Sequence, residues 1–165
     1  MIRPVLPADA PALAAIYNPY IRDTTITFEE EPVAAEEMAA RIAKVAEAHP
    51  WLVWEEAGRV LGYAYASTWR ARAAYRHSTE TAIYLAMDQQ GKGIGTALYR
   101  ALLDDLRARG FHLALGGVAL PNEASVRLHE KLGFRKAGHM REAGRKFDRW
   151  IDVGFWELLL EGEAP

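Results

Sequence analysis

The sequence contains no cysteine, no long apolar run and no strong excess of one charge. The missing cysteines exclude disulfides, thiol nucleophiles and cysteine-ligated zinc. No apolar stretch approaches the roughly 18 residues of a membrane helix, and no secretory signal is visible, so we expect a cytoplasmic protein with no membrane partner. The formal net charge of −2 provides no basic field, which argues against a nucleic-acid partner.

The 165 residues have the size and composition of one soluble domain, which we place at residues 1–165. Hydrophobic periodicity predicts strands alternating with helices, and this order indicates an α/β sandwich around one sheet. Asp9 is predicted to cap the first helix, and Gly110 and Gly133 to end the third and fourth. The expected strands are 2–5, 51–55, 59–67, 81–87, 111–120, 134–139 and 150–159; the expected helices follow Asp9 and then span 34–48, 94–109 and 122–132.

Residues 87–96, Met-Asp-Gln-Gln-Gly-Lys-Gly-Ile-Gly-Thr, form a glycine-rich turn between a predicted strand and a predicted amphipathic helix. Glycines allow the backbone to approach an anion, and the N–H groups at a helix N-terminus favour phosphate. The spacing matches neither of two common phosphate loops. Lys92 precedes the last two glycines, which excludes the Walker pattern, and Leu98 stands where the dinucleotide pattern needs glycine. A turn without a ligand remains the alternative.

Two motifs together resemble the GCN5-related N-acetyltransferase (GNAT) family. Gln90-x-x-Gly93-x-Gly95 resembles its acetyl-CoA pyrophosphate loop, and a helix from Asn122 to Gly133-Phe134 resembles its second hallmark, in which the Asn contacts the pantetheine arm. The resemblance implies the GNAT fold, a mixed, mostly antiparallel central sheet flanked by helices, with strands splayed at the acetyl-CoA site. The implied acetyl-CoA contacts are Ile83, Tyr84, Leu85, Gln90, Gly91, Lys92, Gly93, Ile94, Gly95, Thr96, Asn122 and Ser125.

Further motifs narrow the resemblance to phosphinothricin N-acetyltransferases and their relatives that acetylate methionine sulfoximine or methionine sulfone. They include Ile16-Tyr17-Asn18, Trp69-Arg70-x-Arg72-x-x-Tyr75 and Leu128-His129-Glu130, and they extend over about residues 2–158. The resemblance implies transfer of acetyl from acetyl-CoA to the α-amino group of a small anionic amino-acid analogue, directly within a ternary complex. It also implies a homodimer. We expect no metal, because the five histidines are scattered.

Two residues are candidates for the proton transfers. From the residues alone, the favoured interpretation of Glu80 is a solvated carboxylate at a strand edge, and a lone helical His129 is more often structural or exposed. In the family, however, the Glu before the cofactor-contacting strand is assigned as the base, and the His of the Leu-His-Glu motif is considered catalytic. We therefore predict Glu80 as general base and His129 as general acid, although an imidazole can act in either direction.

The acceptor is expected to bind through cations and aromatic groups. Arg70 and Arg72, two apart in a loop predicted to be extended, suit a carboxylate or phosphinate. Tyr75 adds a hydroxyl, Phe28 a wall, and Lys146 is expected to close the site from a second chain. Departures from the group are Gly91 in place of Arg and His77 in place of Trp. The alternatives are a peptide or polyamine acceptor, or a CoA-binding module without catalysis.

Overall fold

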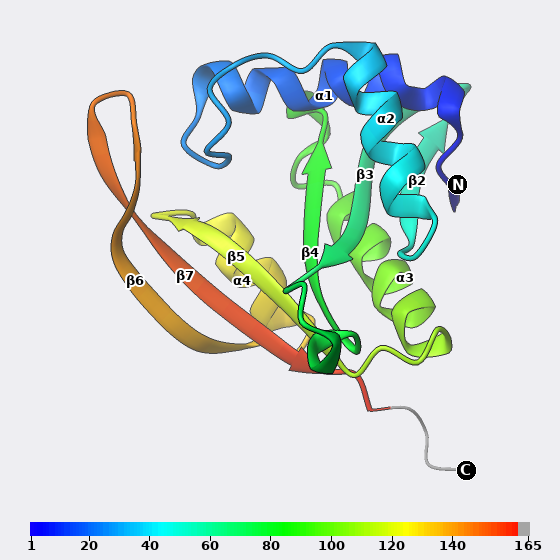
Figure 1. Ribbon diagram of the computed structural model, residues 1–165. Coiled ribbons are helices and arrows are strands. Elements are labelled where there is room, and N and C mark those ends of the chain that lie inside the picture. Colours follow the sequence, from blue (N-terminus) through cyan, green and yellow to red (C-terminus); the bar gives the residue numbers. More distant parts are fainter. Residues whose placement is uncertain (162–165) are drawn as a thin grey trace.

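The computed structural model describes residues 1–161, which build one seven-stranded sheet flanked by helices (Figure 1). The strand order is β1-β2-β3-β4-β5-β7-β6. The strands are β1 (Ile2–Pro4), β2 (Trp51–Glu56), β3 (Arg59–Thr68), β4 (Ser78–Leu85), β5 (Leu113–Leu120), β6 (Arg135–Lys146) and β7 (Arg149–Leu159). The helices are α1 (Ala10–Asp23), α2 (Ala35–Ala46), α3 (Ile94–Ala108) and α4 (Glu123–Lys131), with 3-10 turns η1 (Pro7–Asp9), η2 (Ala73–Tyr75) and η3 (Met87–Gln89).

Strands β4 and β5 are the one parallel pair and they soon separate. Their pairing ends where Glu80 lies opposite Leu115, whereas β5 goes on to pair with β7 up to Leu120. Beyond Glu80 the two strands diverge, and the sheet opens as a V between them (Figure 1). The predicted splay of a mixed, mostly antiparallel sheet is confirmed.

The two faces of the sheet carry different helices. Helix α3 packs on one face, where the Thr81 hydroxyl meets that of Tyr99, and α4 lies beside β5 on the same face. Helices α1 and α2 cover the other face, where Tyr84 packs edge-on against Tyr17 and Tyr20. Because side chains alternate along β4, residues 80, 82 and 84 face α1, and residues 79, 81, 83 and 85 face α3.

Several predicted element ends need correction. Asp9 directly precedes α1 but does not cap it, because its carboxylate accepts the Leu6 N–H and the Arg3 guanidinium. The predicted stops at Gly110 and Gly133 are confirmed, since both adopt positive φ after their helices, a conformation that favours glycine. Strand β4 begins three residues earlier than predicted and ends at Leu85, since Met87–Gln89 turns into the glycine loop.

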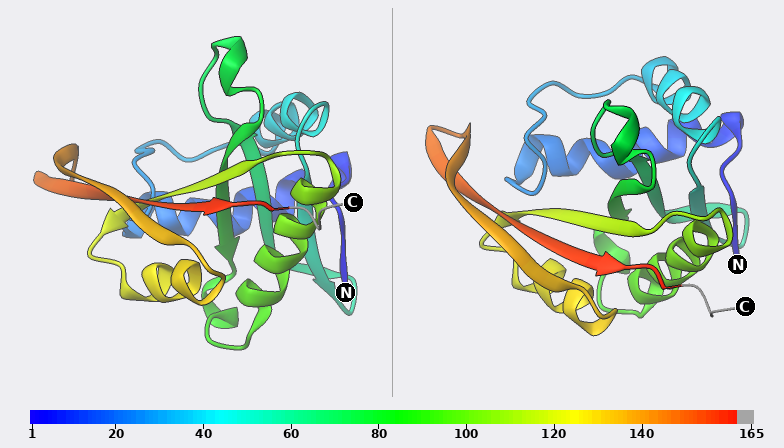
Figure 2. Two further views of the ribbon diagram at one scale, coloured as in Figure 1. Left: turned by 90° about the horizontal axis from the view of Figure 1, so that it is seen from below. Right: turned by 60° about the horizontal axis from the view of Figure 1, so that its bottom comes forward.

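The β6–β7 hairpin is much longer than predicted and projects from the body as a twisted arm (Figures 1 and 2). Its pairing register shifts between Met140 and Gly144, and Glu142 there has φ of 52°. A bulge of this kind bends a hairpin and increases its twist. The arm therefore reaches the segment between α1 and α2, against which Lys146 is buried.

Candidate active site

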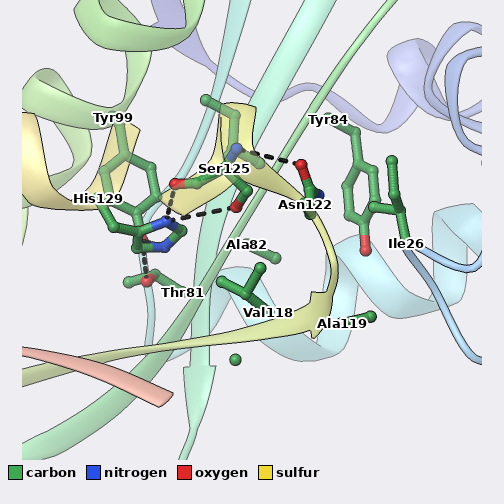
Figure 3. Close-up of a pocket in the computed structure, with 12 residues that line it drawn as sticks. Ile26, Thr81, Ala82, Tyr84, Tyr99, Val118, Ala119, Asn122, Ser125 and His129 are labelled. Atoms are coloured by element: carbon green, nitrogen blue, oxygen red, sulfur yellow. Dashed lines mark hydrogen bonds between the residues drawn. The ribbon is translucent and has the colours of Figure 1, made fainter. Parts of the chain in front are cut away.

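A small cavity lies in the opening between β4 and β5, and both faces of the sheet contribute to it (Figure 3). Its volume is about 60 Å³. Ile26, from the segment between α1 and α2, closes one side, and helix α4 closes another. The residues that line it are Ile26, Thr81, Ala82, Ile83, Tyr84, Tyr99, Gly117, Val118, Ala119, Asn122, Ser125 and His129.

A larger groove of about 470 Å³ continues from this cavity along the glycine loop and α4. Ile26, Ile83, Asn122 and Ser125 line both spaces, so the groove leads into the gap between the strands. Its walls are Tyr20, Ile26, Ile83, Leu85, Gln90, Gly91, Gly93, Gly95, Thr96, Asn122, Ala124, Ser125, Arg127, Leu128 and Lys131.

The end of this groove at the glycine loop fits the pyrophosphate of acetyl-CoA. Gly91 and Gly93 have φ of 76° and 83°, and a Cβ on either would meet no atom within 4 Å, so the backbone there is open to a ligand. No side chain of residues 1–161 caps α3, so the first N–H groups of that helix remain available to an anion.

The predicted acetyl-CoA contacts divide into wall residues and others. Lys92 donates to Gln89 Oε1 at 3.1 Å and is not among the described residues that line the groove. Ile94 is buried in the core, so only its backbone N–H can face a phosphate. Tyr84 reaches the small cavity from the α1 face rather than the groove. The predicted residues on the groove walls are Ile83, Leu85, Gln90, Gly91, Gly93, Gly95, Thr96, Asn122 and Ser125.

Asn122 and Gln90 are both held in place by hydrogen bonds. Asn122 Oδ1 accepts the Ser125 N–H at 3.2 Å and caps α4, as the sequence predicts (Figure 3). Gln90 Nε2 donates to Tyr20 Oη at 3.1 Å, and that hydroxyl donates to Leu85 O at 2.6 Å. Tyr20, which the sequence analysis did not select, therefore ties the glycine loop to the end of β4.

Glu80 lies on the α1 face at the last position of β4 that pairs with β5. A Cβ added to Gly117 would lie 3.3 Å from Glu80 Oε1, so the carboxylate sits over β5 next to a residue that lines the cavity. Burial raises the pKa of the Glu80 carboxyl above its usual value. A carboxylate whose pKa moves toward neutrality is a better proton acceptor.

His129 lies on the opposite face and is only 4% exposed. Its Nδ1 is 2.7 Å from Ser125 O, and its Nε2 is 3.0 Å from Tyr99 Oη (Figure 3). A carbonyl only accepts, so Nδ1 carries a proton. Burial lowers the pKa of His129, while the hydrogen bond to the Ser125 carbonyl opposes this.

Two adjacent glycines of β5 make room for these side chains. A Cβ on Gly116 would fall 2.7 Å from His129 Cδ2, and one on Gly117 would crowd Glu80 and Phe155 from the other face. Successive strand residues point to opposite faces, so one glycine serves each candidate. The sequence analysis missed this pair, although Gly-Gly inside an apolar strand is itself a signal of close approach.

Phe28 and Lys146 come together where the hairpin arm meets the segment between α1 and α2, and neither is among the described residues that line the two cavities. The Phe28 ring occupies the space above Gly144, where a Cβ would lie 2.6 Å from Cζ. Lys146 Nζ donates to Thr27 O at 2.9 Å, and burial lowers its pKa. The prediction placed Lys146 in the site of a second chain. The structure places it against its own chain, because the bulged hairpin bends back.

The described residues that line the two cavities do not include Arg70, Arg72 or Tyr75. These three residues lie on the segment between β3 and β4, which projects from the body and contains a 3-10 turn rather than extended chain (Figure 2). Arg70 lies over the Trp69 ring at 5.2 Å, and Trp69 meets Phe155 edge-on at 5.8 Å. Through Phe155 the base of this segment adjoins Gly117 and hence Glu80.

Within residues 1–161, no group of three or more His, Asp or Glu is placed to hold a metal ion. No helix of this part of the chain is long and apolar enough to cross a membrane.

Comparison with known proteins gives a consistent picture. A family model described as an acetyltransferase (GNAT) domain matches residues 2–154. The phosphinothricin N-acetyltransferase of Streptomyces viridochromogenes is 42% identical over 164 residues, which cover 99% of this chain and 90% of that protein. The L-methionine sulfoximine/L-methionine sulfone acetyltransferase of Pseudomonas paraeruginosa is 40% identical over 93% of this chain and 91% of its own length.

A similar solved structure is a phosphinothricin acetyltransferase from Sinorhizobium meliloti in complex with acetyl-CoA. Its TM-score is 0.93 at 36% identity, with 96% of this chain and 87% of that chain covered. An acetyltransferase from Salmonella typhimurium with acetyl-CoA gives a TM-score of 0.95 at 35% identity, covering 100% and 96%. The fold, the family model and the full-length identity agree, and the chain belongs to the GNAT family of acetyltransferases.

Proposed function

We propose that this enzyme transfers an acetyl group from acetyl-CoA to the α-amino group of phosphinothricin, methionine sulfoximine or methionine sulfone. The observation that carries the proposal is the opening between β4 and β5, which joins the groove on the α3 side to the acceptor side. Relatives named for these three acceptors are about 40% identical over nearly the whole chain.

Acetyl-CoA, when bound, supplies an activated thioester. The uncapped start of α3 and the open glycines hold its pyrophosphate, while Ile83, Asn122 and Ser125 border the path toward the gap. The two substrates reach the gap from opposite faces and react directly in a ternary complex. An acyl-cysteine cannot form, because the chain has no cysteine.

Glu80 acts as general base on the acceptor side. An α-amino group with a pKa near 8 is partly protonated at pH 7, and its proton must leave before or during attack. The raised pKa of Glu80 and its place beside Gly117 suit this role.

His129 acts as general acid on the donor side. Both its ring nitrogens are hydrogen-bonded within the fold, and the Ser125 hydroxyl lies 3.4 Å from Nδ1 and borders both cavities. The proton for the departing thiolate passes from His129 through this hydroxyl.

The acceptor's anionic groups are held by cations at the rim. Lys146 is 2% exposed, and of its three N–H groups one donates to Thr27 O. Arg70 and Arg72 stand on the projecting segment next to the Glu80 side of the sheet, and we propose that this segment folds over the acceptor. Cations here favour an anionic amino acid and disfavour a polyamine.

We also propose a homodimer formed through the hairpin arm. Met140, Phe147 and Trp150 are 48%, 51% and 62% exposed on this arm, an unusual concentration of apolar surface. Sedimentation should give the mass of two chains, and a Trp150→Glu variant should shift it toward one.

The test is release of CoA from acetyl-CoA with a panel of amines. Phosphinothricin, methionine sulfoximine and methionine sulfone should each be acetylated, with mass spectrometry locating acetyl on the α-nitrogen. Polyamines and a peptide N-terminus are the comparison acceptors. Preference for either would overturn the acceptor proposal, and binding of acetyl-CoA without transfer to any amine would favour a CoA-binding module.

A further inference from the structure

A buried chain of hydrogen bonds runs from α4 through α3 to the place where β4 and β5 part. His129 Nδ1 contacts Ser125 O at 2.7 Å, and His129 Nε2 contacts Tyr99 Oη at 3.0 Å. Tyr99 Oη then lies 2.5 Å from Thr81 Oγ1, which donates to Leu115 O at 3.0 Å. Tyr99 has no exposed surface and Thr81 is 5% exposed, so these hydrogen bonds are shielded from bulk solvent at the edge of the small cavity.

Counting protons shows that this chain is incomplete when the imidazole is neutral. Both ends are carbonyl oxygens, which only accept. The four contacts each need one proton, yet one threonine hydroxyl, one tyrosine hydroxyl and a neutral imidazole supply three. One contact must then place two acceptors face to face, which is unfavourable in a buried setting.

A doubly protonated imidazole supplies the fourth proton and fixes the direction of all four hydrogen bonds. Nδ1–H donates to Ser125 O, Nε2–H donates to Tyr99 Oη, Tyr99 donates to Thr81, and Thr81 donates to Leu115 O. This gain opposes the effect of burial on His129.

Of the remaining neighbours of His129, only the Ser125 hydroxyl, 3.4 Å from Nδ1, can share a ring proton. Phe134 and Trp156 face the ring at centroid distances of 5.1 and 6.5 Å, and Gly116 lies beneath it. Glu80 acts on Tyr99 through space from the other face, and its negative charge favours a proton on the chain.

We propose that Tyr99 is a positioning residue of this enzyme which, with Thr81, keeps His129 in its doubly protonated, proton-donating form. The catalytic role of Tyr99 rests on the proposed acetyl transfer, whereas the direction of the hydrogen bonds does not. A chain running the other way, in which Tyr99 donates to Nε2, would instead favour the neutral imidazole.

The sign of the shift in the His129 titration midpoint distinguishes these two directions of hydrogen bonding. The ring nitrogens of His129 are titrated by NMR in the full-length protein, with the signals assigned from a His129→Asn variant. Tyr99→Phe and Thr81→Val should each lower the His129 titration midpoint by about one pH unit, since each removes the route that accepts the second proton. Thr81→Val provides the same reading if Tyr99→Phe fails to fold.

Two residues outside this chain of hydrogen bonds serve as matched controls. Thr79 is on the same strand and face, but its hydroxyl donates to Ser67 O, and Tyr63 is a buried tyrosine of the other face. Thr79→Val and Tyr63→Phe should leave the midpoint unchanged. A midpoint that rises or stays constant in Tyr99→Phe overturns the proposal.

Activity provides the second reading. In Tyr99→Phe, kcat relative to the wild type should fall at neutral pH and recover toward lower pH, with the KM for acetyl-CoA unchanged. A ratio of the two kcat values that is the same at every pH would contradict the positioning role. If the wild type releases no CoA with any acceptor while the midpoint shifts as expected, the acetyl-transfer proposal fails and the hydrogen-bond chain stands.

Discussion

At the scale of single residues, burial shifts the pKa values of the two proposed catalytic groups in opposite directions. Burial disfavours charge on either group, so the pKa of the Glu80 carboxyl is raised and that of the His129 imidazole is lowered. Both shifts move the pKa in the direction that weakens the charged form. For Glu80 this makes a stronger base, and for His129 a stronger acid when protonated.

Glu80→Gln should lower kcat by about 10²- to 10⁴-fold, the usual contribution of a general base. The raised pKa of Glu80 also predicts the sign of a stability effect. The folded state favours the protonated carboxyl, so its stabilising contribution is complete below the ordinary glutamate pKa of 4.5 and is lost as the pH rises through the higher pKa of the folded state.

At pH 7, therefore, Glu80→Gln should be at least as stable as the wild type, and the difference should vanish near pH 4. Thermal unfolding at the two pH values measures this. A variant that is inactive and also much less stable at pH 7 would show that Glu80 serves the fold rather than the reaction.

At the scale of elements, strand β5 provides space for both candidates through Gly116 and Gly117. Gly116→Ala should destabilise the protein by about 1–3 kcal/mol, because its Cβ overlaps the His129 ring. It should also reduce kcat. In a His129→Ala background the same change should cost far less, since the ring is gone.

Chemical denaturation of both single variants and the double variant measures this coupling. Gly138→Ala on β6 is the matched control, because a Cβ there meets nothing within 4 Å. Additive losses in the double variant would contradict the overlap of Gly116 with His129.

The hairpin arm meets the Phe28 ring, a proposed wall of the acceptor site, at Gly144. Gly144→Ala should displace the Phe28 ring and raise the KM of the acceptor several-fold, while the KM of acetyl-CoA stays constant. Steady-state kinetics with each substrate varied in turn separates the two constants. A change confined to the acetyl-CoA constant would place Phe28 at the donor side instead.

Elements with strong local signals were predictable from the sequence, and features set by long-range contacts were not. Gly133 ends α4 and Asn122 caps it as predicted, because both act within one turn of helix. The contact between Lys146 and Thr27 joins residues 119 apart in sequence, and no local pattern encodes it. The role of Asp9 likewise depends on Arg3 in a neighbouring strand.

The same limit applies to the site. The glycine loop is recognisable from its own spacing, and in the structure its residues line the groove. Tyr99 and Thr81 look like ordinary core residues in sequence, and only the packing of α3 on β4 reveals their contact with His129. Which face of the sheet each candidate occupies also follows from the register rather than from any motif.

At the scale of the whole molecule, charge pairs tie the edge of the sheet to the first helix. Arg3 on β1 bridges Asp9 before α1 and Glu55 on β2, with distances of 2.7 and 2.6 Å. The hydrogen bond from Arg3 holds the pKa of Asp9 below its usual value. Such a carboxylate stabilises the fold above its unfolded pKa, and the contribution is lost as the pH falls through the folded value.

Asp9→Asn should therefore lower the free energy of unfolding at pH 7 by on the order of 1 kcal/mol, and the difference should shrink toward pH 2. Urea unfolding at several pH values measures it. Asp23→Asn is the control, because the Arg22–Asp23 pair is exposed and should show no measurable change. An equal loss in both variants would contradict this account.

We propose that donor and acceptor meet in the gap between β4 and β5 and react without an acetylated enzyme. Initial rates with acetyl-CoA and phosphinothricin varied together test this proposal. The structure predicts reciprocal plots that intersect, with acetyl recovered on the α-nitrogen of the acceptor. Parallel lines, or acetylated enzyme formed from acetyl-CoA alone, would contradict it.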